Sequence, residues 1–371
     1  MNEDKLRELT AFDKSAYTEE LEPVFPNCNN AIVFESSGLY APYLDVAIRS
    51  LISNISDNNY YDIIILTSEI DIYDCNLLRS EIENYNNVSL RFYDPSKLVE
   101  PYINTSRYRY LNLNYYRLAL PWILQKYEKI LNLGMDIVIK KDVSELLKIQ
   151  MSDTEYIAGV KDLGYIGRLS MDIPKEELNL KNPEGYINAD VIVLNNKNIR
   201  RDFSLDSVLE LWQKYKFRCA EQDAFNVLFE NHIHYLDMKW NVFPRKMNSI
   251  IHIAHNSDEN IQIYKASVKD PYIVHFAAFP KSWDYPTVEY ADLWWYYARK
   301  SPYYEELIRR MIIANKGLIY SKLSFKQKVY NKLAMFSRKH TNIFIKVGKK
   351  VFIKYFTNSE SNHKWGKLGG K

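Results

Sequence analysis

The chain is poor in the residues that interrupt regular structure. Its 371 residues include only 11 glycines and 13 prolines, about half the usual share of these two residue types. This composition excludes a collagen-like or low-complexity chain. Aromatic residues make up 14% of the sequence and include 30 tyrosines, far more ring surface than disordered segments carry. The sequence therefore predicts a folded globular protein.

Cysteines and long apolar runs are also scarce. Cys28, Cys75 and Cys219 are too far apart for a Cys-x-x-Cys motif, and an odd number cannot all pair within one chain, so they indicate thiols in a reducing compartment. No stretch approaches the roughly 18 consecutive apolar residues of a membrane-spanning helix. The acidic N-terminus, MNEDKLRELT, has no apolar signal-peptide core. We therefore expect a cytoplasmic protein without a membrane span.

Common catalytic motifs are absent from the sequence. It contains no P-loop, no Gly-x-Gly-x-x-Gly after the first predicted strand, no Gly-x-Ser-x-Gly and no His-Glu-x-x-His. Most kinases, dehydrogenases, serine hydrolases and zinc proteases are excluded by these absences.

Apolar runs alternate with helical patterns along the chain. Three runs, at residues 31–35, 62–68 and 88–94, are separated by segments in which apolar residues recur at helical spacing. Buried runs joined by helices predict an α/β fold, with a Rossmann-like sheet covered on both faces. Further strands are expected at 129–133, 156–161 and 191–195, helices at 114–126, 142–149, 205–216 and 221–230, and a flap or loop at 164–184.

The formal charge of +3 conceals a basic C-terminus. From Lys316 onward about 14 lysines and arginines accompany a single acid, Glu360. Between residues 324 and 356, apolar and basic residues interleave as in an amphipathic helix at a membrane surface. Anionic lipids attract such segments. A solvated tail that packs partly on the core is the alternative, and nucleic-acid binding is disfavoured because the body lacks basic stripes.

One acidic strand end, LNLGMDIVI at residues 131–139, is a candidate site. Asp136 follows a buried run, and open α/β folds bind ligands where their strands end. A carboxylate there suits Mg²⁺ or Mn²⁺. A simple turn or capping role for Asp136 is the alternative.

Seven segments, in order, resemble glycosyltransferase family 8, whose members are retaining enzymes of the GT-A fold in bacterial lipopolysaccharide and capsule assembly. They are residues 34–44, 115–121, 131–146, 185–195, 221–229, 240–241 and 275–283. The resemblance covers residues 30–300 and implies a GT-A domain with a mixed sheet. Residues 1–29 then form an N-terminal extension, read as a short helix, and residues 301–371 form a helical basic tail.

The resemblance also implies roles for individual residues. It assigns metal binding to Asp136 and His275, donor binding to Ser37, Tyr40, Arg117 and Lys281, and catalysis to Gln222, Asp223 and Asn188. The implied cofactor is Mn²⁺ or Mg²⁺. The implied reaction transfers a hexose from a UDP-sugar, with retention, to a glycan or lipid-linked glycan at the inner face of the plasma membrane. Without the resemblance, each residue has a simpler structural explanation. His275 could be a core histidine, Arg117 a solvated cation, and Gln222 and Asp223 helix-capping residues.

The sequence departs from the family pattern at several positions. The first aspartate of the family's Asp-x-Asp motif is Gly134, and the glycine after Asn-Ala is Asp190. Ser37-Gly38-Leu39 replaces Asp-Asp-Asn, and Ala278 replaces the glycine of His-x-x-Gly. These changes leave two hypotheses: an active transferase, or an impaired GT-A module that binds a glycan, a nucleotide sugar or a partner transferase. Activity is favoured by the six polar residues that match the family pattern: Asp136, Asn188, Gln222, Asp223, His275 and Lys281. If Gly134 is a lost ligand position, Gly134→Asp is expected to tighten Mn²⁺ binding.

Overall fold

The computed structural model describes residues 14–26, 28, 30–103, 112–171, 178–214, 217–244, 256–277 and 280–321. Ala278 and the predicted amphipathic segment at 324–356 lie outside these residues. The chain divides into two units, Met1–Met311 and Ile312–Lys371. The contacts described below belong to the first unit.

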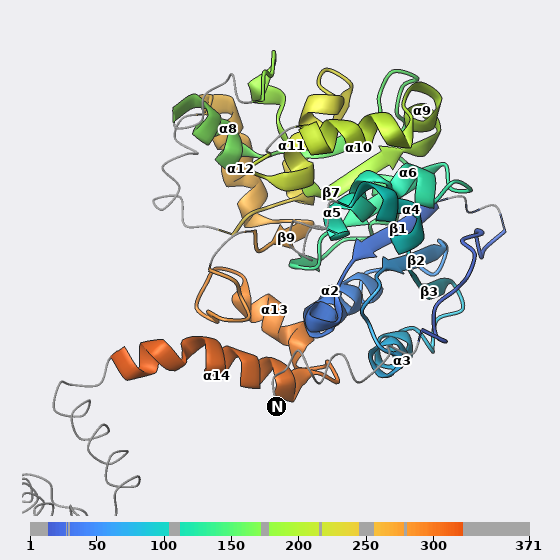
Figure 1. The fold of residues 1–371 in the computed structure, drawn as a ribbon. Helices are drawn as coiled ribbons and strands as arrows, with labels where there is room; N and C mark the ends of the chain where they lie inside the picture. Colours follow the sequence, from blue (N-terminus) through green and yellow to red (C-terminus); the bar gives the residue numbers. More distant parts are fainter. Residues whose placement is uncertain are drawn as a thin grey trace, which may run out of the picture. The chain divides into compact units, whose positions relative to one another are not determined.

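The described residues form the strands and helices labelled in Figure 1. The strands are β1 (Asn30–Glu35), β2 (Tyr61–Leu66), β3 (Val88–Tyr93), β4 (Lys129–Leu133), β5 (Ile137–Ile139), β6 (Ile157–Lys161), β7 (Ile187–Asn195), β8 (Ile233–Tyr235) and β9 (Ile273–His275). The helices are α2 (Ala41–Ile52), α3 (Ile72–Ser80), α4 (Ser96–Val99), α5 (Asn112–Leu118), α6 (Leu120–Ile123), α7 (Ser144–Leu147), α8 (Leu163–Met171), α9 (Asn196–Asp202), α10 (Leu205–Lys214), α11 (Ala220–Leu228), α12 (Asp258–Lys269), α13 (Ala291–Ala298) and α14 (Tyr304–Ser321). Among these helices, none is long and apolar enough to cross a bilayer.

A seven-stranded mixed sheet forms the centre of the first unit. Its strand order is β3-β2-β1-β4-β7-β6-β8. Strands β1 to β4 run parallel, whereas β7 is antiparallel to both β4 and β6. A second, two-stranded sheet pairs β5 with β9. The predicted α/β fold with a mixed sheet is therefore confirmed.

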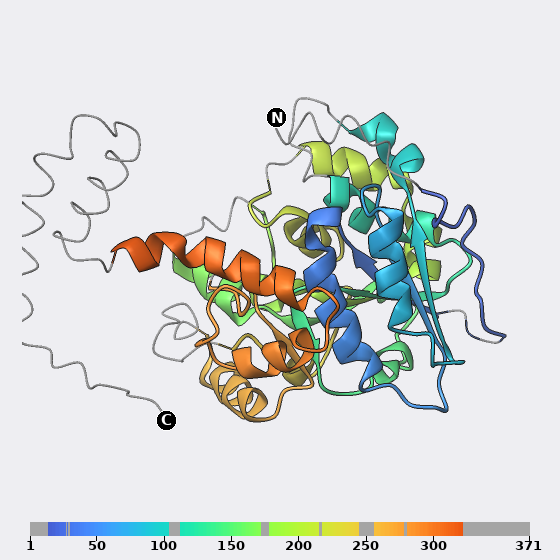
Figure 2. The same cartoon turned by 90° about the horizontal axis from the view of Figure 1, so that it is seen from below.

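Helices cover both faces of the sheet, as the apolar runs predict. Every residue of β2 is buried. In β1, Ile32 and Phe34 pack into a core cluster with α2 and α3, while Ala31 and Val33 pack into a second cluster with α5 and α6. Figures 1 and 2 show α2 and α3 on one side of the sheet and α5, α10 and α11 on the other. Alternate side chains of one strand thus anchor two helical layers.

Two local expectations were wrong, and a third finds no support in the described residues. The helix predicted over residues 114–126 is divided into α5 and α6, and Pro121 lies in the first turn of α6, where a proline needs no backbone N–H partner. The segment expected as a flap begins as α8. Residues 14–26 and 28, the described part of the N-terminal extension, contain no helix, and Tyr17 forms a β-bridge with Phe92 on the edge strand β3.

The pairing of β5 with β9 brings two distant segments to one sheet edge. Ile137 lies opposite His275 in this ladder, and the Phe276 N–H donates to the Asp136 carbonyl over 2.8 Å. Gly134 continues the β4–β7 ladder, because its N–H donates to the Asp190 carbonyl, also over 2.8 Å. The ends of β4 and β9 and the middle of β7 therefore meet at one place.

Glu81 gives the fold a pH-dependent element. Burial, with the nearby Asp45, raises the pKa of Glu81 to about 7 even though it pairs with Arg49. A carboxyl group with a higher pKa in the folded chain holds an extra proton there. The contribution of Glu81 to stability is therefore full below its ordinary pKa of 4.5 and is lost as pH rises to 7.

We expect Glu81→Gln to remove this part of the pH dependence. Between pH 5 and pH 8 the free energy of unfolding of the wild type should fall by about 2 kcal/mol more than that of the variant. Urea unfolding at both pH values measures the difference. Glu83→Gln, a change at an exposed residue of the same segment, is the control and should follow the wild type. Parallel curves for wild type and Glu81→Gln would contradict the assignment.

Candidate active site

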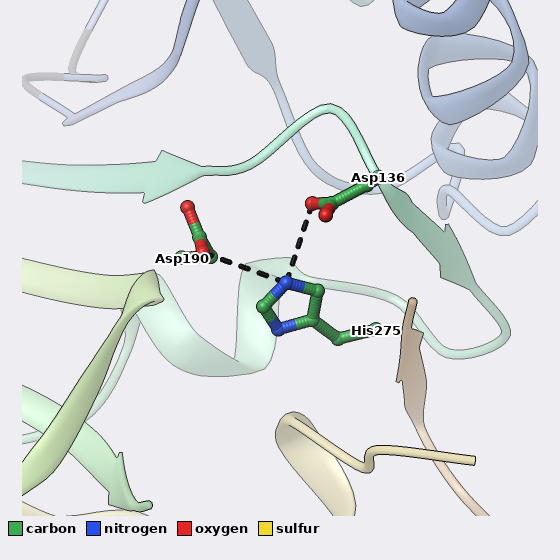
Figure 3. Close-up of side chains that lie close together, drawn as sticks. All are labelled: Asp136, Asp190 and His275. Carbon is green, nitrogen blue, oxygen red and sulfur yellow. Dashed lines mark ion pairs between the residues drawn. The ribbon is translucent and has the colours of Figure 1, made fainter. Parts of the chain in front are cut away.

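Asp136, Asp190 and His275 converge at this sheet edge. One ligand atom from each of the three side chains lies within 4.8 Å of the others. The His275 Nε2 atom lies 3.2 Å from Asp136 Oδ1 and 3.4 Å from Asp190 Oδ2 (Figure 3). Asp136 comes from the loop before β5, Asp190 from β7 and His275 from the end of β9. Two carboxylates and one imidazole thus face a common point.

A chain of amide groups fixes the tautomer of His275. The backbone N–H of Asp190 donates to Asn188 Oδ1 over 3.0 Å, and Asn241 Nδ2 donates to the same oxygen over 2.9 Å. Asn241 Oδ1 therefore faces His275 Nδ1, 2.8 Å away, and that nitrogen must carry the proton. In the neutral ring, Nε2 then presents its lone pair to the two carboxylates.

A divalent cation fits this arrangement. His275 is fully buried, and within the described part of the chain its Nε2 atom has no hydrogen-bond partner. A lone pair beside two anions is unfavourable unless a proton or a cation lies between them. Carboxylate oxygens and an imidazole nitrogen are ligands that Mn²⁺ accepts. The predicted ligands Asp136 and His275 are therefore brought together in a donor set that suits a metal.

The charges around Asp136 keep its carboxylate ionised. Burial by itself would raise the pKa of Asp136, but His275 and Lys281 hold that pKa well below its usual range. Burial would likewise lower the pKa of His275, and the Asp136 carboxylate raises it instead. Lys281 Nζ donates to Asp136 Oδ2 and, over 2.8 Å, to the Phe276 carbonyl. Lys281 thus places a fixed cation beside the candidate metal site.

Aromatic contacts connect Lys281 with the region after β1. The Lys281 ammonium lies 5.3 Å from the centre of the Trp283 ring, which packs against Tyr43 at 4.6 Å. Tyr43 in turn contacts Tyr40 at 6.0 Å. The predicted donor residue Ser37 is half-buried before the short helix that contains Tyr40, and its carbonyl accepts the Tyr40 N–H over 2.9 Å.

Arg117 is engaged by three carboxylates. Its guanidinium donates to Glu35 Oε2 over 3.1 Å and 3.2 Å, to Asp190 Oδ1 over 3.0 Å and to Glu221 Oε1 over 2.8 Å. These anions raise the pKa of Arg117 in spite of its burial. Burial raises the pKa of Glu35 and that of Glu221, and Arg117 opposes both shifts. Arg117 therefore holds the Asp190 carboxylate in place.

The predicted catalytic residues belong to one hydrogen-bond network. Gln222 Oε1 accepts from Asn188 Nδ2 over 2.8 Å and from the Ala189 N–H over 3.1 Å. Asp223 is fully buried and accepts from the Tyr186 hydroxyl over 2.6 Å and from the backbone N–H groups of Arg218 and Cys219. Asn188 and Gln222 thus connect α11 to the Asn241–His275 pair, whereas Asp223 uses both oxygens within the core. Their catalytic roles stay predictions.

Sequence analysis missed four polar residues of the site: Glu35, Asp190, Glu221 and Asn241. A glutamate that ends an apolar run, as in AIVFE, was a usable signal for Glu35. Asp190 was noted only as a departure from the family pattern. Its contact with Arg117 depends on the antiparallel placement of β7, which no local pattern encodes.

Solved structures of glycosyltransferases share this fold. The apo structure of the bifunctional glycosyltransferase WbbM matches 78% of this chain with a TM-score of 0.72 at 24% identity, over 53% of its own length. The structure of the galactosyltransferase LgtC with donor and acceptor sugar analogues matches 74% of this chain with a TM-score of 0.61 at 21% identity, over 96% of its own length. Both likenesses show the fold, which is the GT-A fold of glycosyltransferases.

The sequence model of glycosyl transferase family 8 matches residues 31–287. The chain therefore belongs to this family, as the resemblance implied. A lipopolysaccharide 1,2-glucosyltransferase of Escherichia coli is 27% identical over 179 residues, 46% of this chain and 49% of the relative. The chain thus spans about half the length of this curated relative, and about half that of WbbM.

Proposed function

We propose that the protein is a metal-dependent retaining transferase, which moves a hexose from a UDP-sugar to a hydroxyl group of a cell-surface glycan. The observation that carries the proposal is the buried Nε2 of His275, which faces the carboxylates of Asp136 and Asp190 beside the Lys281 ammonium. Such a group of ligands with an adjacent cation suits a metal-bound diphosphate. The named activity of the Escherichia coli relative supports a lipopolysaccharide-type acceptor.

Each polar group has a part in this proposal. Asp136 and His275 would hold Mn²⁺ or Mg²⁺, and the bound ion would offset negative charge on the diphosphate. Lys281 neutralises the same phosphates from the protein side. Asn188 and Gln222 hold the donor sugar in position. Asp223 fixes the Tyr186 hydroxyl, which in turn accepts a hydrogen bond from Gln222 Nε2. Ser37, Tyr40 and Tyr43, which follow β1, line the nucleoside side of the donor site.

Donor hydrolysis tests the proposed function. A panel of UDP-sugars, with GDP-sugars as the control donors, is incubated with the protein in the presence and absence of Mn²⁺. We expect release of UDP from at least one UDP-hexose, dependent on Mn²⁺ and with the anomeric configuration retained in the sugar product. Release of UDP at the same rate with and without Mn²⁺ would overturn the proposal. So would hydrolysis that is confined to GDP-sugars.

One observation favours the alternative of a catalytically impaired binding module. Arg117, which the resemblance implied to be a donor-binding residue, is occupied by Glu35, Asp190 and Glu221. Tight UDP binding without hydrolysis of any UDP-sugar, and without transfer to lipopolysaccharide fragments, would support this alternative.

Lys281→Ala is expected to weaken UDP binding about 10- to 100-fold in the presence of Mn²⁺, because a charge-assisted contact to phosphate contributes about 1.5–3 kcal/mol. Calorimetric titration of UDP measures the change. Lys265→Ala, at an exposed lysine of α12, is the matched control and should bind as the wild type does. Equal affinity of wild type and Lys281→Ala would remove Lys281 from the donor site.

The basic tail is proposed to attach the protein to the inner face of the plasma membrane. Its predicted amphipathic segment lies outside the described residues, so the proposal depends on the sequence pattern. The full chain should float with anionic liposomes at low salt and be released at high salt, because exposed charges are screened. A chain that ends at Asn315 should remain at the bottom of the gradient. Identical flotation of both proteins would exclude the tail as the anchor.

A further inference from the structure

Two departures from the family pattern lie next to each other in space. Gly134 continues β4 and Asp190 lies in β7, and the N–H of Gly134 donates to the carbonyl of Asp190. In the adjacent register, Leu133 pairs with Val191. The glycine at the position where the resemblance implies a metal-binding aspartate, and the aspartate at the position where it implies a glycine, are therefore cross-strand neighbours.

The side chain of Asp190 fills the space that a side chain at position 134 needs. A Cβ atom placed on Gly134 would lie 2.9 Å from Asp190 Oδ1, 3.0 Å from its Cβ and 3.1 Å from its Cγ. Gly134 has no positive φ angle, so its backbone conformation is open to other residues. A side chain at position 134 would thus collide with the Asp190 side chain where it now lies.

The Asp190 carboxylate is held where a metal ligand is needed. Its Oδ1 accepts from Arg117 over 3.0 Å, and its Oδ2 lies 3.4 Å from the buried Nε2 of His275. The side chain keeps 30% of its surface exposed, so a ligand can reach it. Asp136, the other carboxylate of the group, contacts the same nitrogen. Figure 3 shows both carboxylates at the Nε2 edge of the His275 ring.

We infer that Gly134 and Asp190 are a reciprocal exchange, in which Asp190 supplies from β7 the metal-binding carboxylate that residue 134 does not supply from β4. Asp190 is a metal ligand, and Arg117 orients it. Positions 134 and 190 together then have room for the side chain of one carboxylate residue, not of two. This inference rests on the proposed metal-dependent function and names a ligand of that site.

The exchange reverses the expected effect of Gly134→Asp. The new side chain would push Asp190 away from Arg117 and His275 and would place a further negative charge in the cluster. Gly134→Asp alone should therefore lower the melting temperature and weaken Mn²⁺ binding. Asp190→Gly alone should weaken Mn²⁺ binding at least about tenfold, because a ligand is lost.

The double variant Gly134→Asp/Asp190→Gly should recover both properties, with Mn²⁺ affinity within about threefold of the wild type, since coupled neighbours are non-additive. The experiment titrates MnCl₂ into the four full-length proteins without nucleotide and measures their melting temperatures without metal. Asp190→Asn, which keeps the shape of the side chain, replaces Asp190→Gly if the latter does not fold. Asp153→Asn, at an exposed loop residue, is the control.

The outcomes separate this inference from the proposed function. If Asp190→Gly or Asp190→Asn binds Mn²⁺ as the wild type does, Asp190 is not a ligand, even where UDP-sugar hydrolysis depends on Mn²⁺. If the double variant binds no better than Asp190→Gly and melts no higher than Gly134→Asp, the exchange is overturned. Absence of UDP-sugar hydrolysis, with the expected Mn²⁺ and melting results intact, overturns the transferase proposal alone.

Discussion

Asp136→Asn is expected to lower the Mn²⁺-dependent turnover of a UDP-sugar about 100- to 1,000-fold, the size of effect seen when one electrostatic group is removed from an active site. The substitution keeps the shape of the side chain and removes the charge that faces both His275 and Lys281. A neutral amide is a poor ligand for a divalent ion and no longer pairs with the lysine. Higher concentrations of Mn²⁺ should not restore the rate.

Steady-state hydrolysis of the donor, measured over a series of Mn²⁺ concentrations, gives this result directly. Asp292→Asn, at an exposed position of α13, is the matched control. A melting temperature close to that of the wild type shows that the variant is folded. Turnover of Asp136→Asn within about threefold of the wild type, with its Mn²⁺ dependence intact, would show that the end of β4 is not the metal site.

The sheet could be predicted because burial on both faces leaves a local signal. Strands β1 and β2 are apolar runs bounded by polar residues, and each is buried as its sequence indicates. The division between α5 and α6 was less accessible, because proline tolerates either a kink or a new first turn and the packing decides between them. The antiparallel entry of β7 beside β4 has no local signal, because a buried strand reads the same in either direction.

The site residues could be predicted only where the role of a residue does not depend on which residue lies next to it in space. Asp136, His275 and Lys281 match the family pattern one by one, and the structure brings these three together. Asp190 could not be assigned in this way, since its role depends on the absence of a side chain at Gly134 across the strand pair. Arg117 was expected beside the donor, but its carboxylate partners come from two strands and one helix, β1, β7 and α11.

Arg117→Met is expected to lower the free energy of unfolding by about 3–5 kcal/mol at pH 8, because it leaves buried carboxylates without their cation. Methionine fills much of the same volume, so the loss reports mainly the missing charge. Glu35 and Glu221, whose pKa values burial already raises, should then take up protons more readily in the folded chain. A folded state that binds more protons than the unfolded state gains stability as pH falls.

The deficit of Arg117→Met should therefore shrink between pH 8 and pH 5.5, which urea unfolding at the two pH values measures. Arg299→Met, at an exposed arginine after α13, should cost little at either pH, because exposed charges contribute little to stability. Arg117→Lys keeps the charge but loses the forked contacts to Glu35 and Asp190, and an intermediate loss is expected. A loss for Arg117→Met that is equal at both pH values would mean that packing of the side chain, and not the pairing of its charge with three carboxylates, stabilises this region. Asp190 would then need another group to hold it beside His275.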